Sequence, residues 1–206
     1  LNINIKLPES LSKASQISQK NNPELIIANL ELEQSDKDVT IARADLAPSV
    51  SLSFQSTKTE DLSSTYDERD KEVLKATVSW PVFSGGKNRA TLKKNRNLNN
   101  QKKLLFDDAT NSNKTNVASA WSSYQSSKSL LDSVRSQVKA AEIAYEGITI
   151  EYESGLGRST LDVIQSNTLL LDSKISLANS ERNYLLSQLK LLQSIGLLTA
   201  EYLKIN

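Results

Sequence analysis

The feature that most restricts the fold of this chain is a repeat of side chains spaced three and four residues apart. From Val117 onward the repeat consists of Trp121, Tyr124, Lys128, Leu131, Val134, Val138, Ala141, Tyr145, Ile148 and Tyr152. This spacing is close to the 3.5-residue period at which one helix packs along another in a coiled coil, and only Lys128 interrupts it with a charge. The repeat therefore predicts a long unbroken helix over residues 85–152, which at 1.5 Å per residue would be roughly 100 Å long.

A second stripe of the same period occupies the segment that follows. Its members are Leu171, Ile175, Ala178, Arg182, Leu185, Leu189 and Leu192. Between the two stripes, residues 152–158 read Tyr-Glu-Ser-Gly-Leu-Gly-Arg, and glycine is favoured where a tight turn needs a positive φ. We expect a turn over residues 153–161, a return helix over 162–196 and a short tail over 197–206. The two helices would form a long antiparallel coiled-coil hairpin.

The first 48 residues predict a short helix followed by a longer one. After an extended lead-in, Pro8 suits the first position of a helix because its φ is fixed near the helical value. Asn22 suits the N-cap of the second helix, with Pro23 at the first helical position. This second helix should end at about Asp45, because Pro48 disfavours helical backbone in the residue before it.

Residues 49–81 change to the two-residue period of β-strands. The apolar members of this alternation are Val50, Leu52, Phe54, Leu74, Ala76, Val78 and Trp80, and polar side chains separate them. We expect strands over residues 49–57 and 72–80, each of about nine residues, which is close to the length that spans a membrane when tilted. Residues 58–70 are polar and acidic and should form an exposed loop.

Two interpretations of this β-hairpin stay open at this point. It could be an amphipathic hairpin packed on a soluble domain. However, the apolar seams of the helices are used by the coiled coil, and a lone hairpin is marginal in water. Alternatively the hairpin could enter a membrane. Lipid tolerates no open sheet edge, so the two strands would have to join others in a closed barrel formed by further repeats or further chains.

The composition excludes several classes of function. Hydrophobic residues make up 38% and aromatic residues 5% of the chain, which is low for a thick core but usual for paired helices. The net charge of +1 gives no indication of a nucleic-acid partner. The chain has no histidine and no cysteine, which excludes His-based catalysis, His-ligated metal sites and thiol chemistry. With no nucleophile–base pair, phosphate-binding loop or metal cluster, we expect neither an enzyme nor a cofactor.

The ends of the chain and its hydropathy give two further expectations. No run of about 18 apolar residues is present, so no transmembrane helix is expected. The sequence starts at Leu1 and has no methionine, and we interpret it as a segment of a longer precursor whose export signal would lie upstream.

The order of elements and several local motifs resemble one repeat of a known channel family. The motifs are Leu7-Pro8, Asn21-Asn-Pro-Glu-Leu25, Leu46-Ala-Pro-Ser-Val50, Pro81-Val-Phe-Ser-Gly-Gly86, Tyr152-Glu-Ser-Gly155 with Asp162-Val-Ile164, and Ala178-Asn-Ser-Glu-Arg-Asn-Tyr-Leu185 leading to Gly196. Nearly the whole chain resembles one structural repeat of the TolC-like outer-membrane efflux channels. Phe83-Ser-Gly-Gly86 resembles the opening of the second of the two repeats in that family.

The resemblance implies a mainly α fold with a β-hairpin, in which strands join a transmembrane β-barrel and helices join a periplasmic α-barrel. It implies a homotrimer of the full-length chain in the outer membrane, with its helical part in the periplasm. It also implies an exit duct for efflux or type I secretion that works with an inner-membrane transporter and a periplasmic adaptor protein. Outer-membrane lipid would be a further partner, and nucleic acid would not.

The resemblance also assigns roles to residues near the turn. Asp162 resembles a gate or cation-sensing position, and Tyr152 and Arg158 resemble residues that hold neighbouring hairpins together. The turn is one residue longer than the usual pattern, and Gln165 stands where some members carry a second acid. Apart from the family, Ser159 and Asp162 fit a capping box, in which each caps the other's backbone N–H.

Two further groups of residues receive roles in the same way. Ser154, Gly155 and Leu156 resemble the motif contacted by the adaptor, although Gly155 also suits a helix C-cap. Pro48 and Pro81 would mark the junction between barrel and tunnel, and they terminate helix or strand in any fold. The alternative function is a soluble coiled-coil scaffold or interaction module without channel activity. The alternating strands and the two junction prolines favour the channel.

Overall fold

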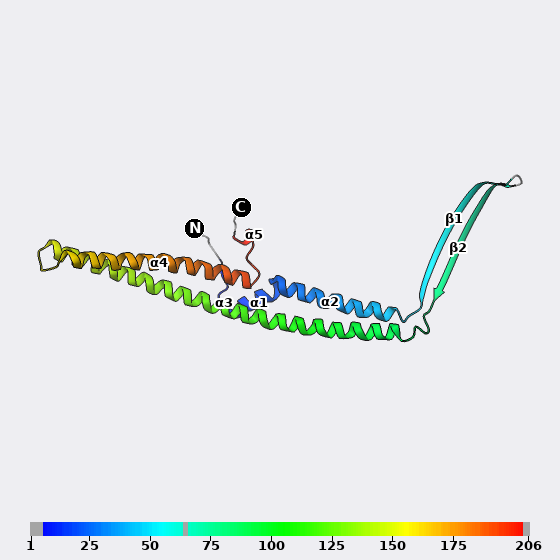
Figure 1. Cartoon of the computed structure of the whole chain (residues 1–206), viewed down its shortest axis with the longest axis horizontal. Coiled ribbons are helices and arrows are strands. Elements are labelled where there is room, and N and C mark those ends of the chain that lie inside the picture. Colours follow the sequence, from blue (N-terminus) through cyan, green and yellow to red (C-terminus); the bar gives the residue numbers. More distant parts are fainter. Residues whose placement is uncertain (1–5, 64–65, 204–206) are drawn as a thin grey trace. The chain divides into compact units, whose positions relative to one another are not determined.

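The computed structural model describes residues 6–63 and 66–203, and these form helices and one β-hairpin (Figure 1). The described part of the chain divides into two compact units. One holds the residues up to Ile27 together with those from Asp107 onward, and the other holds Ala28–Phe106. The predicted fold class, mainly helical with a long antiparallel helix pair and a two-stranded hairpin, is confirmed. Among the described helices, none has a long enough apolar stretch to span a membrane.

Helix α1 (Leu11–Asn21) begins three residues later than predicted. Ser10 is its N-cap, and the Ser10 hydroxyl accepts a hydrogen bond from the Lys13 N–H at 3.3 Å. A serine side chain can accept a hydrogen bond from an N–H of the first helical turn, and a proline side chain cannot. The helix therefore starts after Ser10, and Pro8 lies before it. Helix α2 (Pro23–Ala44) has the predicted start, because the Asn22 side chain accepts from the Glu24 N–H at 2.9 Å.

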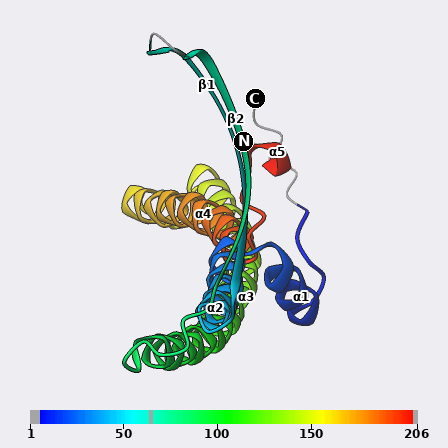
Figure 2. The ribbon, with the colours of Figure 1, turned by 90° about the vertical axis from the view of Figure 1, so that its right-hand side faces the viewer.

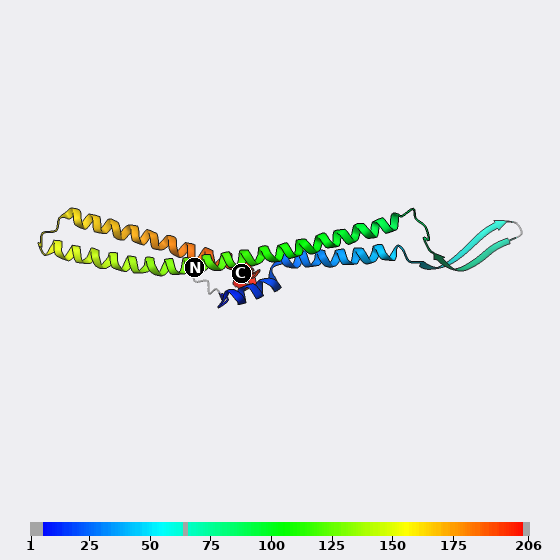
Figure 3. The ribbon, with the colours of Figure 1, turned by 90° about the horizontal axis from the view of Figure 1, so that it is seen from below.

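Helix α3 (Lys87–Glu153) is continuous over 67 residues, and α4 (Thr160–Ser194) runs back alongside it in the first unit (Figure 3). The predicted seam of α3 is largely confirmed, since Val117, Leu131, Val134, Val138 and Ala141 are buried. Two members are exceptions and are exposed, namely Tyr152 at the end of the seam and Lys128. Ser127 is half-buried and takes its place, so the seam contains no charge at this point.

The seam predicted for α4 is wrong over most of its length. Leu171 and Ile175 are 53% and 61% exposed, and of that stripe only Leu192 is buried. The buried residues of α4 before its last turn are instead Ser166, Leu170, Ser173, Ser180, Ser187 and Leu191. Serine recurs here at every seventh position, and the hydroxyls of Ser173 and Ser187 bond to carbonyls of their own helix. Such self-satisfied small side chains let α3 approach closely without a polar partner.

The hydrophobic core lies where α1 meets α3 and the end of α4. It consists of Ala14, Val117, Leu191, Leu192 and Ile195. Beside it lies a buried polar group, in which the Ser18 hydroxyl donates to Asn113 Oδ1 at 2.6 Å and the Asn22 amide donates to the Ser194 carbonyl at 3.0 Å. Because Asn22 caps α2 and Ser194 ends α4, this bond joins the beginning of one helix to the end of the other.

In the second unit, α2 runs along the first part of α3. The least exposed face of α2 is mainly apolar and includes Leu32, Val39 and Ala42, and several polar contacts join the two helices. The Asn95 amide donates to the Asp38 carbonyl at 3.4 Å, and the Asn99 amide donates to Ser35 Oγ at 2.9 Å. Lys102 forms an ion pair with Glu31 at 2.7 Å. Polar residues at seam positions fix the register of two helices at a cost in stability.

Strands β1 (Ser49–Ser63) and β2 (Tyr66–Ser79) run antiparallel beside each other, as all three ribbon views show (Figure 2). They are longer than predicted, and the predicted loop over residues 58–70 is wrong. Lys58 pairs with Asp70 and Thr59 with Arg69. The opposite charges of Lys58 and Asp70 face each other across the ladder, and such a pair stabilises a sheet. The tail also contains a short helix, α5 (Ala200–Leu203), and the Tyr202 hydroxyl donates to the Lys6 carbonyl at 2.6 Å.

Candidate functional site

The turn between α3 and α4 is built on glycines at positive φ. Gly155 has φ 71° and Gly157 has φ 81°. The Gly155 N–H donates to the Tyr152 carbonyl at 3.2 Å and the Leu156 N–H donates to the Glu151 carbonyl at 3.0 Å, which is the bonding pattern of a Schellman motif. The predicted C-cap role of Gly155 is therefore confirmed, and it fixes how Ser154 and Leu156 leave the helix.

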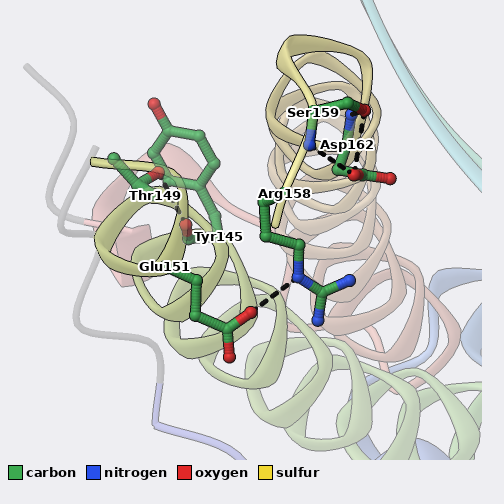
Figure 4. A network of polar contacts seen from close by, with 6 residues as sticks. All are labelled: Tyr145, Thr149, Glu151, Arg158, Ser159 and Asp162. Carbon is green, nitrogen blue, oxygen red and sulfur yellow. Dashed lines mark hydrogen bonds and ion pairs between the residues drawn. The ribbon is translucent and has the colours of Figure 1, made fainter. Parts of the chain in front are cut away.

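Ser159 and Asp162 form the predicted capping box at the start of α4 (Figure 4). The Ser159 N–H donates to Asp162 Oδ2 at 2.8 Å, and the Ser159 hydroxyl donates to the same oxygen at 2.9 Å. These bonds to Ser159 hold the pKa of the Asp162 carboxyl below its ordinary value, and the positive charge of Arg158 acts in the same direction. The capping role and a role facing solvent are compatible, because Asp162 is only half-buried.

Arg158 pairs within its own hairpin. Its Nε donates to Glu151 Oε2 at 2.6 Å, as Figure 4 shows, and both side chains are about half exposed. The hydrogen bond and charge of Glu151 raise the pKa of the Arg158 guanidinium. This contact places Arg158 beside the last turn of α3. The sequence carried a signal for this contact, since Glu151 and Arg158 have opposite charge and flank the turn.

The other turn residues named from the sequence lie on the same exposed surface. Tyr152 is 42% exposed, and its hydroxyl lies 3.2 Å from Thr160 Oγ1. Leu156, between the two glycines, is 72% exposed, and Ser154 and Gly155 are exposed as well. Just before the turn, Thr149 bonds to the Tyr145 carbonyl of its own helix (Figure 4). The turn therefore presents Tyr152, Leu156, Arg158 and Asp162 together.

The β-hairpin separates apolar from polar side chains, as the alternation predicts. Val50 faces Val78, Leu52 faces Ala76 and Phe54 faces Leu74 across the ladder. Ser51 opposite Thr77 and Ser53 opposite Lys75 lie on the other face. Directly opposite residues share a face of the sheet, so one face is apolar, and its side chains are exposed within this chain.

At the base of the β-hairpin, two side chains bond to the segment that follows α2, and the sequence analysis assigned this contact to neither of them. Pro48 lies between α2 and β1, and Pro81 follows β2. Next to them, Trp80 Nε1 donates to the Leu46 carbonyl at 3.3 Å, and the Asn88 amide donates to the Asp45 carbonyl at 2.9 Å. Both bonds satisfy carbonyls just after α2 ends. Asn88 and Asn95 are seven residues apart. That spacing is the sequence signal that could have identified both asparagines as contact residues.

The comparisons with known proteins agree with this arrangement. The family model described as "Outer membrane efflux protein" matches residues 14–197. The outer membrane efflux protein BepC of Brucella suis is 22% identical over 198 residues, which cover 96% of this chain and 43% of BepC. The outer membrane protein TolC of Escherichia coli is 24% identical over 206 residues, covering 94% of this chain and 42% of TolC. The chain thus spans about two fifths of the length of these relatives.

Solved structures share the fold at lower sequence identity. The crystal structure of CusC superposes with a TM-score of 0.80 at 13% identity, covering 92% of this chain and 44% of that one. The Campylobacter jejuni CmeC outer membrane channel superposes with a TM-score of 0.76 at 16% identity, covering 95% and 43%. Both the sequence and the fold of this chain therefore recur in one family, which consists of outer-membrane proteins and not of enzymes. The chain belongs to the outer membrane efflux protein family, as its resemblance to TolC-like channels predicts.

Proposed function

We propose that this chain is one repeat of an outer-membrane channel subunit and that its β-hairpin forms part of the wall of a transmembrane barrel. The observation that carries the proposal is the apolar face of the hairpin. Val50, Leu52 and Phe54 are each at least 67% exposed, and the side chains opposite them in the register are apolar too. Exposed apolar faces of this kind require a partner, and lipid is the partner that suits a strand with a polar reverse face.

A barrel made from this hairpin needs more strands than this chain supplies. β1 and β2 pair only with each other among the described residues, so each has a free edge, which the lipid interior does not tolerate. A second repeat in the full-length chain, and a trimer of such chains, would close the barrel. The short span relative to the relatives, about two fifths, supports the presence of a second repeat.

The helices supply a second contact surface that suits such an assembly. We name as the outer stripe the exposed residues Leu161, Ile164, Leu171 and Ile175 of α4. They lie at the coiled-coil spacing that the serine seam also follows, but on another side of the helix. A helix with two such stripes has two neighbours. The first is α3, and we propose that the second is a helix of the adjoining hairpin in the wall of a periplasmic tunnel.

The turn is the proposed gate and adaptor-contact region of this tunnel. Asp162 would contribute one carboxylate to a ring at the narrow end, and Tyr152 and Arg158 would adjust how neighbouring turns pack. Ser154, Gly155 and Leu156 would contact a periplasmic adaptor, through which an inner-membrane transporter delivers its substrate for efflux or type I secretion. The exposure of Leu156 supports such a contact, since a leucine on a loop has no packing role there.

Arginine substitutions on the two faces of the hairpin test the proposal. In the full-length protein, Leu52→Arg places a charge on the proposed lipid face, where the cost reaches about 2–4 kcal/mol at the midplane. Thr77→Arg places the same charge on the proposed water-filled face and is the matched control. We expect outer-membrane trimer yield to fall for Leu52→Arg and to stay near that of the unmodified protein for Thr77→Arg. Equal yields for the two variants would support the soluble scaffold instead.

A further inference from the structure

We infer that the start of α3 binds the phosphate groups of anionic phospholipids. The side chains concerned are named the basic collar, and they are Lys87, Arg89, Lys93, Lys94 and Arg96. The inference rests on the proposed function, because it requires the hairpin to be in a membrane. It adds a lipid class and a set of residues to that function.

The collar is a strong local concentration of charge in a nearly neutral chain. Residues 87–103 contain seven lysines and arginines and no aspartate or glutamate, whereas the net charge of the whole chain is only +1. Alongside the collar, residues 36–45 offer three carboxylates, Asp36, Asp38 and Asp45, and two cations, Lys37 and Arg43. Most of the positive charge of the collar is therefore left uncompensated by the neighbouring helix.

The collar residues have no ionic partner in the described part of the chain. All five are exposed, and the ion pairs among described residues include none of them, whereas Lys102 further along the helix pairs with Glu31 at 2.7 Å. Asn88 and Asn95 alternate with the collar residues. Asn95 bonds to the Asp38 carbonyl of α2, and Asn88 bonds to the Asp45 carbonyl just after α2 ends. The asparagines thus make the helix contact while the charged side chains lie around the rest of the helix.

The position of the collar next to the hairpin identifies the class of anion. Trp80 and Phe83, just after β2, are 62% and 89% exposed, and exposed aromatic rings of this kind are typical of the boundary between lipid and water. Lys87 follows Phe83 by only four positions, so the helix starts within about 14 Å of that boundary. The collar extends over a further 14 Å or so of helix. Its first residues therefore lie within about one or two Debye lengths of the lipid phosphates.

Electrostatic attraction to a membrane surface is additive over nearby basic side chains and is screened by salt. Four collar residues near the surface should together favour an anionic over a zwitterionic phospholipid by at least about tenfold. Phosphatidylglycerol and phosphatidylcholine with identical acyl chains are suitable probes, because they differ in headgroup charge and share the phosphate and the tails.

Native mass spectrometry of the full-length protein in neutral detergent, titrated with each lipid, measures this preference. We expect the unmodified protein to retain phosphatidylglycerol about tenfold better than phosphatidylcholine, with the difference shrinking as salt increases. The quadruple variant Lys87→Gln, Arg89→Gln, Lys93→Gln and Lys94→Gln should lose the preference. The matched control, Lys114→Gln, Lys128→Gln, Lys139→Gln and Lys190→Gln, removes four exposed charges elsewhere on the helices and should keep it.

Two further measurements make the outcomes distinguishable. Inorganic phosphate in excess should not displace phosphatidylglycerol, and displacement would reassign the collar to soluble phosphate compounds. Conductance of the same samples in planar bilayers tests the channel itself. Conducting pores together with an equal lipid preference in the collar and control variants would overturn the lipid site alone. Absence of pores from the unmodified protein would overturn the proposed function first.

Discussion

Arg158 donates from its Nε to the Glu151 carboxylate at 2.6 Å, and this pair connects the loop before α4 to the last turn of α3. The resemblance to TolC-like channels gives Arg158 the role of holding neighbouring hairpins together. In this chain the same guanidinium already has a partner within its own hairpin. Its contribution to a closed state would then be indirect, by fixing the shape of the turn.

Substitution of the two partners separates these roles. If Arg158 acts through Glu151, then Glu151→Gln and Arg158→Ser should raise the resting conductance of the full-length channel by similar amounts. The double variant should add little to either, because both changes break one interaction. An increase for Arg158→Ser with no change for Glu151→Gln, measured in single-channel recordings, would show that Arg158 has a partner on another hairpin.

Three glycines should respond to alanine in a fixed order. A Cβ at Gly196 would lie 2.3 Å from the Asn21 carbonyl oxygen, and its φ is 76°. Gly155 also has positive φ but has open space around it, and Gly147 lies within α3, near its C-terminal end, without that strain. Gly155→Ala should destabilise by about 1–2 kcal/mol, and Gly147→Ala should stabilise by about 0.5–1 kcal/mol.

Gly196→Ala should be the most destabilising of the three, since it adds a backbone clash to the same strain. Thermal unfolding followed by far-ultraviolet circular dichroism gives the order of the midpoints. Equal midpoints for Gly196→Ala and Gly155→Ala would mean that the end of α4 moves away from Asn21 without cost, and that the bond from Asn22 to Ser194 does not fix this junction.

In the pair formed by α3 and α4, the periodicity of the sequence predicts the helices but not all of the residues that they bury. The 3.5-residue repeat placed α3 and α4 correctly, and on α3 every predicted seam residue is buried or half-buried except Lys128 and Tyr152. On α4 it selected the more apolar of two stripes. A helix that has two neighbours carries two stripes, and a single sequence does not say which one faces the nearer partner. Close packing of two helices favours small side chains, so the serine stripe faces α3 and the outer stripe stays exposed.

In the turn and the β-hairpin, too, the sequence predicts some features and not others. The capping box of Ser159 and Asp162 and the positive φ of Gly155 follow from local chemistry and were predictable from a few residues. The pairing of Lys58 with Asp70 was missed because alternation of apolar residues ends there, whereas the backbone ladder continues. The contact of Trp80 with Leu46 depends on how three elements meet, and no local pattern encodes it.

The two stripes of α4 predict opposite effects of substitution. Ser173 is 1% exposed, so Ser173→Leu should overpack the contact with α3 and destabilise the hairpin by about 1–3 kcal/mol. Leu171→Ser, on the outer stripe, should leave the helicity and the thermal unfolding of the α3–α4 helix pair unchanged. The same substitution should weaken trimer assembly. Light scattering and thermal unfolding together measure both effects. A trimer of normal stability in Leu171→Ser would remove the outer stripe from the proposed contact between hairpins.

The pH dependence of cation block distinguishes the two roles of Asp162. Within one chain, the bonds from Ser159 hold the pKa of Asp162 below the ordinary value of 3.8. The capping contribution to stability is therefore complete above that ordinary value and is lost as the pH falls through the lower folded-state value. Three carboxylates converging at a constriction would repel one another and raise the pKa, in the opposite direction. Divalent cations bind only the ionised groups, so block should follow the same titration.

We expect block by divalent cations to be weaker in Asp162→Asn than in the unmodified channel, because the ring would lose its charge. Asparagine still offers a side-chain oxygen to the Ser159 N–H, so the cap should survive, and unchanged thermal unfolding of the variant checks this. In the unmodified channel, half-maximal block at a pH above 3.8 would indicate converging carboxylates, since capping alone shifts the titration downward. Block that is the same in Asp162→Asn, at every pH tested, would leave Asp162 with its capping role and exclude it from the gate.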